Sequence, residues 1–446
     1  MIYLDLGLLL VTSIPLLLLI HASVQERAPR AVAIALAALV VNAALWLGLA
    51  HLAGHPAANG VHVAVVSFVA VAAGASLLRI PATPRRHPLD RIVRFDERDH
   101  MFARNNLRRH PDLAERYYAE HPEKRPIDER IGKRPELGEP GGRYYDPVQT
   151  PLAAAAFAWL DRSRHLASAP STGHPANKDV DQLADQLTRI AKAYGAVDVG
   201  ITPLQDHHVY ARRGRQAERW GDPIERQHAT GVVIVVAMDH AAMAYAPDAP
   251  VIVESSRQYV ESARLAHVMA ELLRTAGHDA RAHVDGNYEV LCVPPAADAG
   301  LGEVGRMSIF MHRTYGPCVR LAVVTTTAPL PSTEHPPSGH VEAFCDICKK
   351  CSDNCPSRAI APGGACESRA FVHWSIDQEA CYGMWRTFGT DCALCIRVCP
   401  FSKPNTPVHQ LARWYVARNG LNRRIALWAD DLLYGRRVGL PPARHR

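Results

Sequence analysis

Charge is scarce at the beginning of this 446-residue chain, and nowhere does it form a strongly basic pattern. The net charge is only +6, and basic residues do not alternate with aromatic ones, so nucleic acid is not expected as a partner. The first apolar stretch has no basic residue and no twin-arginine pair before it, which argues against a cleaved secretion signal. A second apolar stretch follows almost at once, and the missing charge therefore predicts a membrane anchor.

Three segments within residues 1–80 contain no Asp, Glu, Lys or Arg: 6–20, 31–53 and 61–78. Segments of about 20 apolar residues can cross the hydrocarbon core as helices. Arginines follow the first and third segments, whereas the loop after the second has no charge. The positive-inside rule then predicts a multi-pass protein of the inner (cytoplasmic) membrane whose catalytic part faces the cytoplasm, with membrane lipid as one partner.

Four histidines flank these segments: His21, His51, His55 and His62. They are compatible with a haem or quinol site and also with simple polar caps at the membrane interface. Because only three spans are expected and no two histidines match in depth, we expect no haem.

Eight of the 11 cysteines are concentrated in one short stretch. Their order is Cys345-x2-Cys348-x2-Cys351-x3-Cys355-Pro, then Cys381, then Cys392-x2-Cys395-x3-Cys399-Pro. This spacing is typical of two [4Fe–4S] clusters, since two-residue gaps bring three thiolates round one cube. In two-cluster modules the cysteine before proline ligates the other cluster. We therefore assign one cluster to Cys345, Cys348, Cys351 and Cys399, and the second to Cys355, Cys381, Cys392 and Cys395.

Zinc is the main alternative for these cysteines, because tetrahedral thiolate also suits Zn²⁺. Zinc modules, however, favour paired C-x-x-C knuckles without Cys-Pro ends. A disulfide framework fits less well, since closely spaced thiols in a large chain are typical of metal ligands. The residues between Cys381 and Cys392 are expected to form a loop. Cys292, Cys318 and Cys366 lie outside the pattern and are given no role.

The remaining sequence alternates helical and strand patterns, which predicts an α/β layered core. Helices are expected at 180–194 and 254–276, and strands at 197–202, 231–238 and 319–326. The expected domains are an anchor of three transmembrane helices (1–80), an irregular wrapping segment (81–176), the catalytic core (177–330), a ferredoxin-like module with two [4Fe–4S] clusters (331–405) and a C-terminal segment that completes the core (406–446).

The run Gly300-Leu-Gly302-Glu-Val-Gly305 matches the dinucleotide fingerprint letter for letter. That fingerprint needs an acidic residue about 20 positions later, where this chain has Arg320 and Leu321. A nicotinamide site is therefore not expected. The glycines can instead let the backbone approach another large flat ligand, or simply form a tight turn.

Tyr259, Asn287 and Arg320 are candidate catalytic residues. Taken singly, they fit a core aromatic, a turn residue and a surface charge. Taken together they suit proton transfer, because a phenol can donate a proton and a neighbouring guanidinium stabilises the phenolate that remains.

From about residue 95 onward the chain resembles the corrinoid-dependent reductive dehalogenases. The blocks that carry the resemblance are, in order, Arg94-Phe-Asp-Glu-Arg-Asp, Gly195-Ala-Val-Asp-Val-Gly-Ile with Val209-Tyr210, Val236-Ala-Met-Asp239, Glu254 to Tyr259, Ala299-Gly-Leu-Gly-Glu-Val-Gly-Arg306, Tyr315-Gly-Pro-Cys-Val-Arg320, the eight cysteines, Cys399-Pro-Phe-Ser-Lys403 and Asp431-Leu-Leu-Tyr-Gly435.

The resemblance implies a nitroreductase-like core of the α/β (α+β) class that holds a base-off cobamide beside two [4Fe–4S] clusters. It implies replacement of a carbon–halogen bond by carbon–hydrogen in a small organohalide, with two electrons and one proton consumed and halide released. The cofactor carries the hard chemistry. Whether cobalt attacks the carbon or the halogen stays open.

By the same resemblance, Tyr259 takes the proton-donor position and is supported by Arg320 and Asn287. The cofactor contacts are expected from Gly300, Leu301, Gly302, Gly305, Arg306, Pro400 and Lys403. The chain lacks the Asp-x-His-x-x-Gly motif that supplies a histidine to cobalt in other corrinoid proteins. Asp206-His-His208 has the first part of the motif, but Ala211 stands where the motif has glycine. No protein ligand to cobalt is therefore expected.

The fused anchor differs from respiratory members of that family, which typically carry a twin-arginine signal and use a separate small anchor. A quinol-linked or ferredoxin-like electron donor would suit a cytoplasmic location. Two other functions remain open. One is an epoxyqueuosine reductase that acts on tRNA, and the other is a membrane-bound iron–sulfur relay without an organic substrate.

Overall fold

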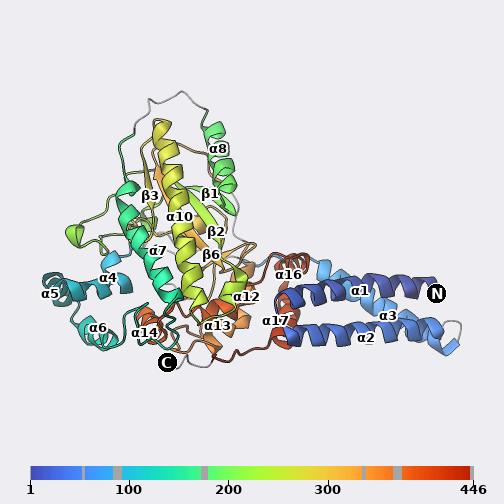
Figure 1. Ribbon diagram of the computed structural model, residues 1–446. Coiled ribbons are helices and arrows are strands. Elements are labelled where there is room, and N and C mark those ends of the chain that lie inside the picture. Colours follow the sequence, from blue (N-terminus) through green and yellow to red (C-terminus); the bar gives the residue numbers. More distant parts are fainter. Residues whose placement is uncertain are drawn as a thin grey trace. The chain divides into compact units, whose positions relative to one another are not determined.

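The computed structural model describes residues 2–52, 56–83, 93–171, 179–333, 338–364 and 374–441 (Figure 1). The chain divides into two compact units that alternate along the sequence. The first, here called the helical unit, comprises Met1–Thr83, Ser338–Cys348 and Lys403–Val438. The second, called the core unit, comprises Pro84–Pro337, Lys349–Ser402 and Gly439–Arg446.

The helical unit begins with three helices, α1 (Ile2–Gln25), α2 (Pro29–His51) and α3 (Pro56–Leu77). All three are long and apolar enough to cross a membrane. Their few polar side chains bond to one another: Asn42 of α2 contacts Thr12 of α1 at 2.9 Å, and His62 Nε2 of α3 lies 3.2 Å from Asp5 Oδ1 of α1. Both Asp5 and His62 are buried, as polar groups between apolar helices must be.

The four histidines of this region differ in their surroundings. His62 pairs with Asp5, His21 lies 3.0 Å from Gln25, and His51 is exposed at the end of α2. His55 lies outside the described residues.

The helical unit also contains α12 (His340–Cys348), α16 (Pro407–Arg418) and α17 (Gly420–Tyr434). Asn419, between α16 and α17, caps α17 and donates hydrogen bonds to the carbonyls of Ala75 and Leu78 at the end of α3. Asn422 donates to the carbonyl of Ser76, 2.9 Å away. The sequence-based expectation assigned 406–446 to the catalytic core, whereas the structure groups Lys403–Val438 with the apolar helices.

The core unit is built on a four-stranded antiparallel sheet with the order β1-β2-β6-β3. The strands are β1 (Asp198–Pro203), β2 (Thr230–Ala237), β3 (Ala280–His283) and β6 (Val319–Thr326). β2 is central and buried on both faces, which explains its continuous run of β-branched residues. Side chains alternate between the faces, so that Val232 and Ile234 point to one layer and Val233 and Val235 to the other.

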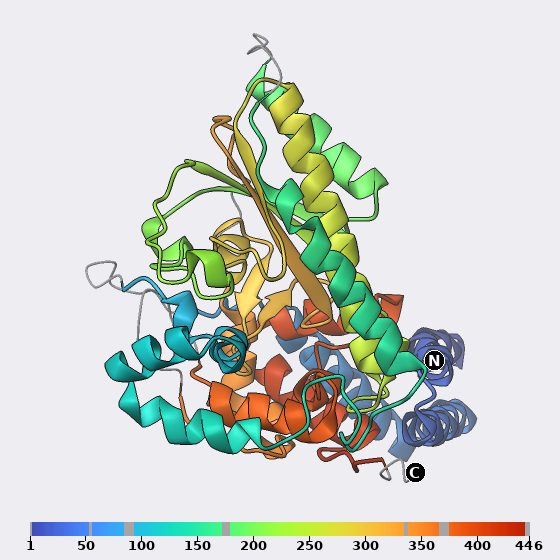
Figure 2. The same ribbon diagram turned by 60° about the vertical axis from the view of Figure 1, so that its left-hand side comes forward.

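Helices cover one face of this sheet. They are α7 (Gln149–Ser163), α8 (Val180–Ala193) and the long α10 (Pro250–Thr275). Figure 2 shows α10 in yellow and α7 in blue-green running side by side. α10 buries Ala263, Ala266 and Met269 completely against the sheet, as its helical periodicity predicts. The mixed helix and sheet layers confirm the α/β character expected from the sequence, at this coarse level.

The segment 81–176, expected to be irregular, contains four α-helices. They are α4 (Met101–Asn106), α5 (Pro111–Glu120), α6 (Arg125–Gly132) and α7. Its prolines begin helices instead of breaking them: Pro111 and Pro126 occupy the first helical turn, where a missing N–H costs nothing. Residues 84–92 and 172–178 of this segment lie outside the described residues.

Candidate functional site

The second set of cysteines converges within the core unit. Cys381 lies on α14 (Gln378–Phe388), and Cys355 follows α13 (Lys350–Asp353). Cys395 lies on α15 (Leu394–Arg397), and Cys392 precedes that helix by two residues. Burial raises the pKa of Cys381 to about 11 and of Cys392 to about 12, and the neighbouring Cys355 contributes to both. The pKa of Cys395 is raised by burial and then by four neighbouring thiols, those of Cys392, Cys381, Cys351 and Cys355. The four thiols of the second set and Cys351 of the first set therefore influence one another within the core unit, and the assignment of four of them to one cluster stays a prediction.

Two left-handed residues shape the cysteine turns. Lys349 (φ 59°) and Ala393 (φ 51°) each directly follow a cysteine and precede a one-turn helix, α13 or α15. The two C-x-x-C segments therefore share a left-handed second residue, although Cys392 is itself left-handed (φ 58°) and Cys348 is the last residue of α12. The stretch between Cys381 and Cys392, expected as a loop, is largely helical, because Asp377 caps α14 and Gly389 (φ 74°) ends it.

The first set is divided between the two units. Cys345 and Cys348 lie on α12 in the helical unit, and Cys351 and Cys399 lie in the core unit. Their assignment to one cluster stays a prediction. Of the cysteines without an assigned role, Cys318 contacts Ser402 at 2.8 Å, and Cys366 lies outside the described residues.

Tyr259 and Arg320 meet at a cavity of about 240 Å³ in the core unit. We call it the tyrosine cavity; its lining includes Tyr210, Tyr259, Tyr288, Cys292, Phe310 and Arg320. Tyr259 comes from α10 and Arg320 from β6, so the buried packing of that helix on the sheet fixes their relative position. The sequence did not single out Tyr210, Tyr288 or Cys292. The Val209-Tyr210 block and the Tyr next to Asn287 were the available signals.

The guanidinium of Arg320 lies over the ring of Tyr259, with 5.0 Å between its Cζ and the ring centroid. Arg320 donates to Ser255 Oγ at 2.7 Å and lies 3.6 Å from Asp391 Oδ2, beside Cys392. Its Nε is buried without a hydrogen-bond partner among the described residues. Arg320 is thus held in place while one donor remains available.

Burial sets the ionisation of this site. It raises the pKa of Tyr259 to about 12, although the positive charge of Arg320 acts in the opposite direction. Burial also raises the pKa of Asp391, again opposed by Arg320. The phenol of Tyr259 is therefore protonated at neutral pH and carries a proton that it can donate.

Asn287 does not bond to this pair. Its Oδ1 accepts hydrogen bonds from Gln216 Nε2 at 2.6 Å and Arg281 Nη2 at 2.8 Å, and its Nδ2 donates to the carbonyl of Arg164. The structure therefore brings two of the three candidate catalytic residues together and gives the third a different set of partners.

The glycine run forms a hairpin of β4 (Gly302–Val304) and β5 (Phe310–His312). A Cβ on Gly302 would lie 2.1 Å from the carbonyl oxygen of Met311, and one on Gly305 would lie 2.8 Å from its side chain. Gly300 has φ 70°, and Leu301 is buried. Strand β4 thus leads into another strand, unlike a dinucleotide fingerprint, which leads into a helix. Their use as corrin contacts stays a prediction.

The other expected cofactor contacts have different surroundings. Arg306 is buried in the core unit, donates to the carbonyl of Ala361 and lies over the ring of Trp374. Pro400 is half-buried. Lys403 belongs to the helical unit, where its Nζ lies 3.1 Å from the centroid of the Tyr434 ring.

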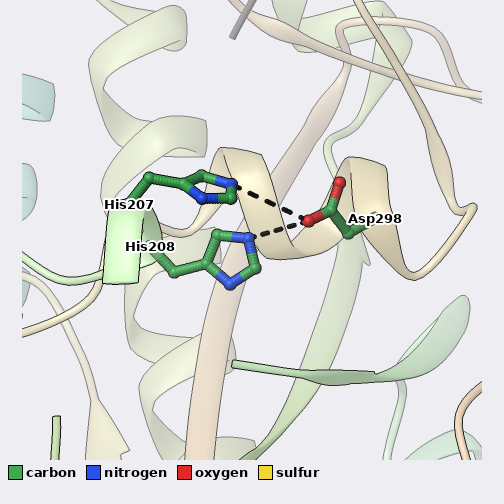
Figure 3. Close-up of side chains that lie close together, drawn as sticks. All are labelled: His207, His208 and Asp298. Atoms are coloured by element: carbon green, nitrogen blue, oxygen red, sulfur yellow. Dashed lines mark hydrogen bonds and ion pairs between the residues drawn. The ribbon is translucent and has the colours of Figure 1, made fainter. Parts of the chain in front are cut away.

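His207, His208 and Asp298 form a compact group of possible metal ligands (Figure 3). The Nε2 atom of His208 lies 2.8 Å from Asp298 Oδ2, and that of His207 lies 3.9 Å away. The backbone N–H of Gln205 donates to His208 Nδ1, so the ring proton of neutral His208 is on Nε2 and is donated to Asp298. His208 Nε2 therefore has no lone pair to offer a metal. The three residues instead link η6 (Asp206–His208) to α11 (Val293–Asp298).

Curated relatives of this chain are reductive dehalogenases. It is 30% identical over 212 residues to the tetrachloroethene reductive dehalogenase of Sulfurospirillum multivorans, a match that covers 46% of this chain and 42% of that protein. A shorter match, 30% identical over 136 residues, joins 29% of the chain to 36% of the epoxyqueuosine reductase of Francisella cf. novicida. The chain spans less than half the length of these relatives. No protein-family model matches it.

Two solved structures are similar to this chain. The catabolic reductive dehalogenase NpRdhA, in complex with 3-bromo-4-hydroxybenzoic acid, matches with a TM-score of 0.63 and 22% identity, over 80% of this chain and 49% of that chain. A reductive dehalogenase described with a mechanism for B12-dependent dehalogenation matches with a TM-score of 0.63 and 24% identity. This match covers 80% of this chain and 48% of that chain. The chain is thus a homologue of the reductive dehalogenases, which are oxidoreductases, and it shares their fold.

Proposed function

We propose that this protein removes halide reductively from a small organohalide, using a base-off cobamide and two [4Fe–4S] clusters. The observation that carries the proposal is the Tyr259–Arg320 pair, which presents a protonated phenol to a largely apolar cavity. The names of its homologues support the reaction class. The overall reaction takes up two electrons and one proton and releases halide.

The cysteines fit iron–sulfur chemistry. Cys355, Cys381, Cys392 and Cys395 supply four buried or partly buried thiols in mutual electrostatic reach, and a cluster would bind them as thiolates. Asp391 precedes Cys392 and faces Arg320, which connects this set to the tyrosine cavity along the backbone. A resident cluster would supply electrons one at a time.

A cobamide fits less simply. The tyrosine cavity, at about 240 Å³, suits a small halogenated molecule, and a corrinoid is several times larger. Its binding therefore requires the cavity walls to open. Support for this cofactor comes from the description of one structural relative as B12-dependent.

The residues of the cavity itself account for proton delivery. Tyr259 Oη holds the proton, and Arg320 lowers the cost of the phenolate that its loss creates. Phe310, Val290 and Leu291 add apolar side chains to the same lining, and apolar surroundings suit protonation of a carbanion-like carbon. Asn287 can support this step only if its present partners are exchanged.

The experiment that tests the function is anaerobic reconstitution with iron, sulfide and cobalamin, followed by metal analysis and halide release. Tetrachloroethene and 3-bromo-4-hydroxybenzoic acid are suitable probes, since relatives are named for them or bind them. We expect bound cobalt, iron and halide release. Iron without cobalt would support the membrane-bound iron–sulfur relay. Reduction of an epoxyqueuosine-modified tRNA without halide release would support an epoxyqueuosine reductase.

We also propose that α1, α2 and α3 span the inner membrane and that the core unit faces the cytoplasm, where a quinol-linked or ferredoxin-like protein donates electrons. Arg27 between α1 and α2, Arg30 in the first turn of α2 and Arg79 after α3 support this orientation. At the C-terminus, a fused reporter that works only in the cytoplasm should be active, and one that works only in the periplasm should be inactive. A periplasmic signal would reverse the orientation while leaving the proposed reaction in place.

A further inference from the structure

The core unit contains two cavities lined by arginines, here called the arginine cavities. Their volumes are about 260 and 350 Å³. Four residues line both: Ser168, Arg213, Arg219 and Arg281. The group is therefore a single cluster of guanidiniums that opens to two adjoining spaces.

Positive charge exceeds negative charge at the centre of this cluster. Arg213 and Arg281 share one carboxylate, Glu289: Arg213 Nη2 bonds to Oε1, and Arg281 Nε lies 3.2 Å from Oε2. The side chains of all three are at most 15% exposed. Arg213 Nε has no hydrogen-bond partner among the described residues. A buried charge without a counter-charge is costly, so this arrangement favours an added anion.

The linings also carry carboxylates besides Glu289: Glu225 and Asp279 in the first cavity and Glu218 in the second. Arg164 lines the second cavity and Arg219 lines both, and their carboxylate partners, Asp161 and Asp222, line neither. The pKa of Arg281 is lowered, first by burial and then by Arg213, Arg219 and Arg274, although Glu289 opposes the change. Among the charged groups that act on the guanidinium of Arg281, arginines thus outnumber carboxylates.

A thin wall separates this cluster from the tyrosine cavity. Val209 pairs with Val290 across it, and side chains alternate along both segments. Tyr210 and Tyr288 face the tyrosine cavity, whereas Asn287 and Glu289 line the arginine cavities. A ligand bound among the arginines would therefore contact the wall of the tyrosine cavity and not the phenol of Tyr259.

We propose that the arginine cavities bind an oxyanion, the phosphate or carboxylate group of a small molecule, through Arg213 and Arg281. Guanidiniums match the geometry of such groups and can donate two parallel hydrogen bonds to them. Arg213 Nε provides a free donor, and Ser168 and Gln216 add polar groups to the lining. The site goes beyond the proposed dehalogenation and does not depend on it.

The test measures binding of inorganic phosphate and benzoate to the full-length protein by calorimetry, with chloride at the same ionic strength as the reference. Wild type should bind at least one of the two oxyanions and unfold at a higher temperature in its presence. Arg213→Met should weaken that binding by about 10-fold or more, because a charge-assisted pair of hydrogen bonds is lost. Without ligand the variant should be as stable as wild type, since Glu289 keeps Arg281 as its partner.

Arg264→Met is the matched control. Arg264 is also paired with a glutamate, Glu261, but it lines neither cavity. The Arg264→Met substitution removes the same charge as Arg213→Met and should leave oxyanion binding unchanged. If Arg213→Met does not fold, Arg219→Gln replaces it, and a several-fold weaker binding is expected there. The proposal is overturned if wild type binds neither oxyanion better than chloride, or if the cavity variants bind as well as the control.

Two sources of the oxyanion can be separated in the same assay. Cobalamin carries a phosphodiester and cobinamide does not. If cobalamin abolishes phosphate binding and cobinamide leaves it intact, the ligand is the phosphodiester of the cofactor. If phosphate still binds with either present, the ligand is a separate small molecule. Both results support the oxyanion site, and this binding is measured independently of halide release.

Discussion

Replacing Tyr259 by phenylalanine is expected to slow halide release by about 10²- to 10⁴-fold, the usual contribution of a positioned general acid. The change removes one oxygen and leaves the ring that packs beneath Arg320. Burial keeps the phenol protonated well above neutral pH, so wild-type activity should show no loss from ionisation of Tyr259 between pH 6 and 8. The measurement is halide released per reconstituted enzyme, with metal content determined for each sample.

Tyr288→Phe is the matched control, because Tyr288 lines the same cavity but has no arginine over its ring among the described contacts. It should retain near wild-type activity. Arg320→Gln should also be slow, and combining it with Tyr259→Phe should add little, since Arg320 acts through the phenolate. Wild-type rates in Tyr259→Phe, or equal losses in Tyr288→Phe, would show that another group delivers the proton.

Changing Cys392 to serine is expected to remove one cluster and with it turnover. Iron should fall from about eight to about four atoms per chain, because a [4Fe–4S] cluster needs four thiolates. Cys392 is held by a left-handed turn (φ 58°) at a buried position, so nearby backbone cannot easily supply a replacement ligand. Iron and sulfide analysis, together with the spectrum of the reduced protein, measure the effect.

Cys292→Ser serves as the comparison, since Cys292 lines the tyrosine cavity and lies outside the cysteine pattern. It should keep full iron content. Unchanged iron in Cys392→Ser would remove Cys392 from the ligand set. Stoichiometric zinc in the wild-type protein would instead favour the zinc alternative for the whole cysteine stretch.

Three of the four strands of the sheet and its covering helix were predictable because their sequence patterns reflect burial directly, whereas the short strand β3 was missed. β6 occupies the expected residues, and β1 and β2 are displaced by one position. Helix α10 begins at Pro250, four residues before the expected start, since proline suits a first turn. The helices within 81–176 were missed because their polar sequence and prolines are also typical of loops, and only tertiary contacts such as Arg104–Asp128 distinguish the two.

The candidate site was predictable in part. Tyr259 and Arg320 came from the resemblance, and the structure places them together. No sequence pattern indicates that Asn287 bonds to Gln216 and Arg281, because that depends on how two distant loops meet. Lys403 was expected at the cofactor. In the structure it contacts Tyr434 and also Glu26, which lies 377 residues earlier in the chain, and no local sequence pattern indicates such a contact.

The junction between α16 and α17 has a consequence for how the protein is made. Asn419 bonds to carbonyls of Ala75 and Leu78, which the ribosome synthesises more than 300 residues earlier. At ordinary elongation rates this corresponds to roughly 20–70 s, during which the end of α3 lacks its partners. Formation of the first three helices and docking of the last two are therefore separate events, and a ribosome that stalls late leaves an intermediate in which the end of α3 lacks its hydrogen-bond partners.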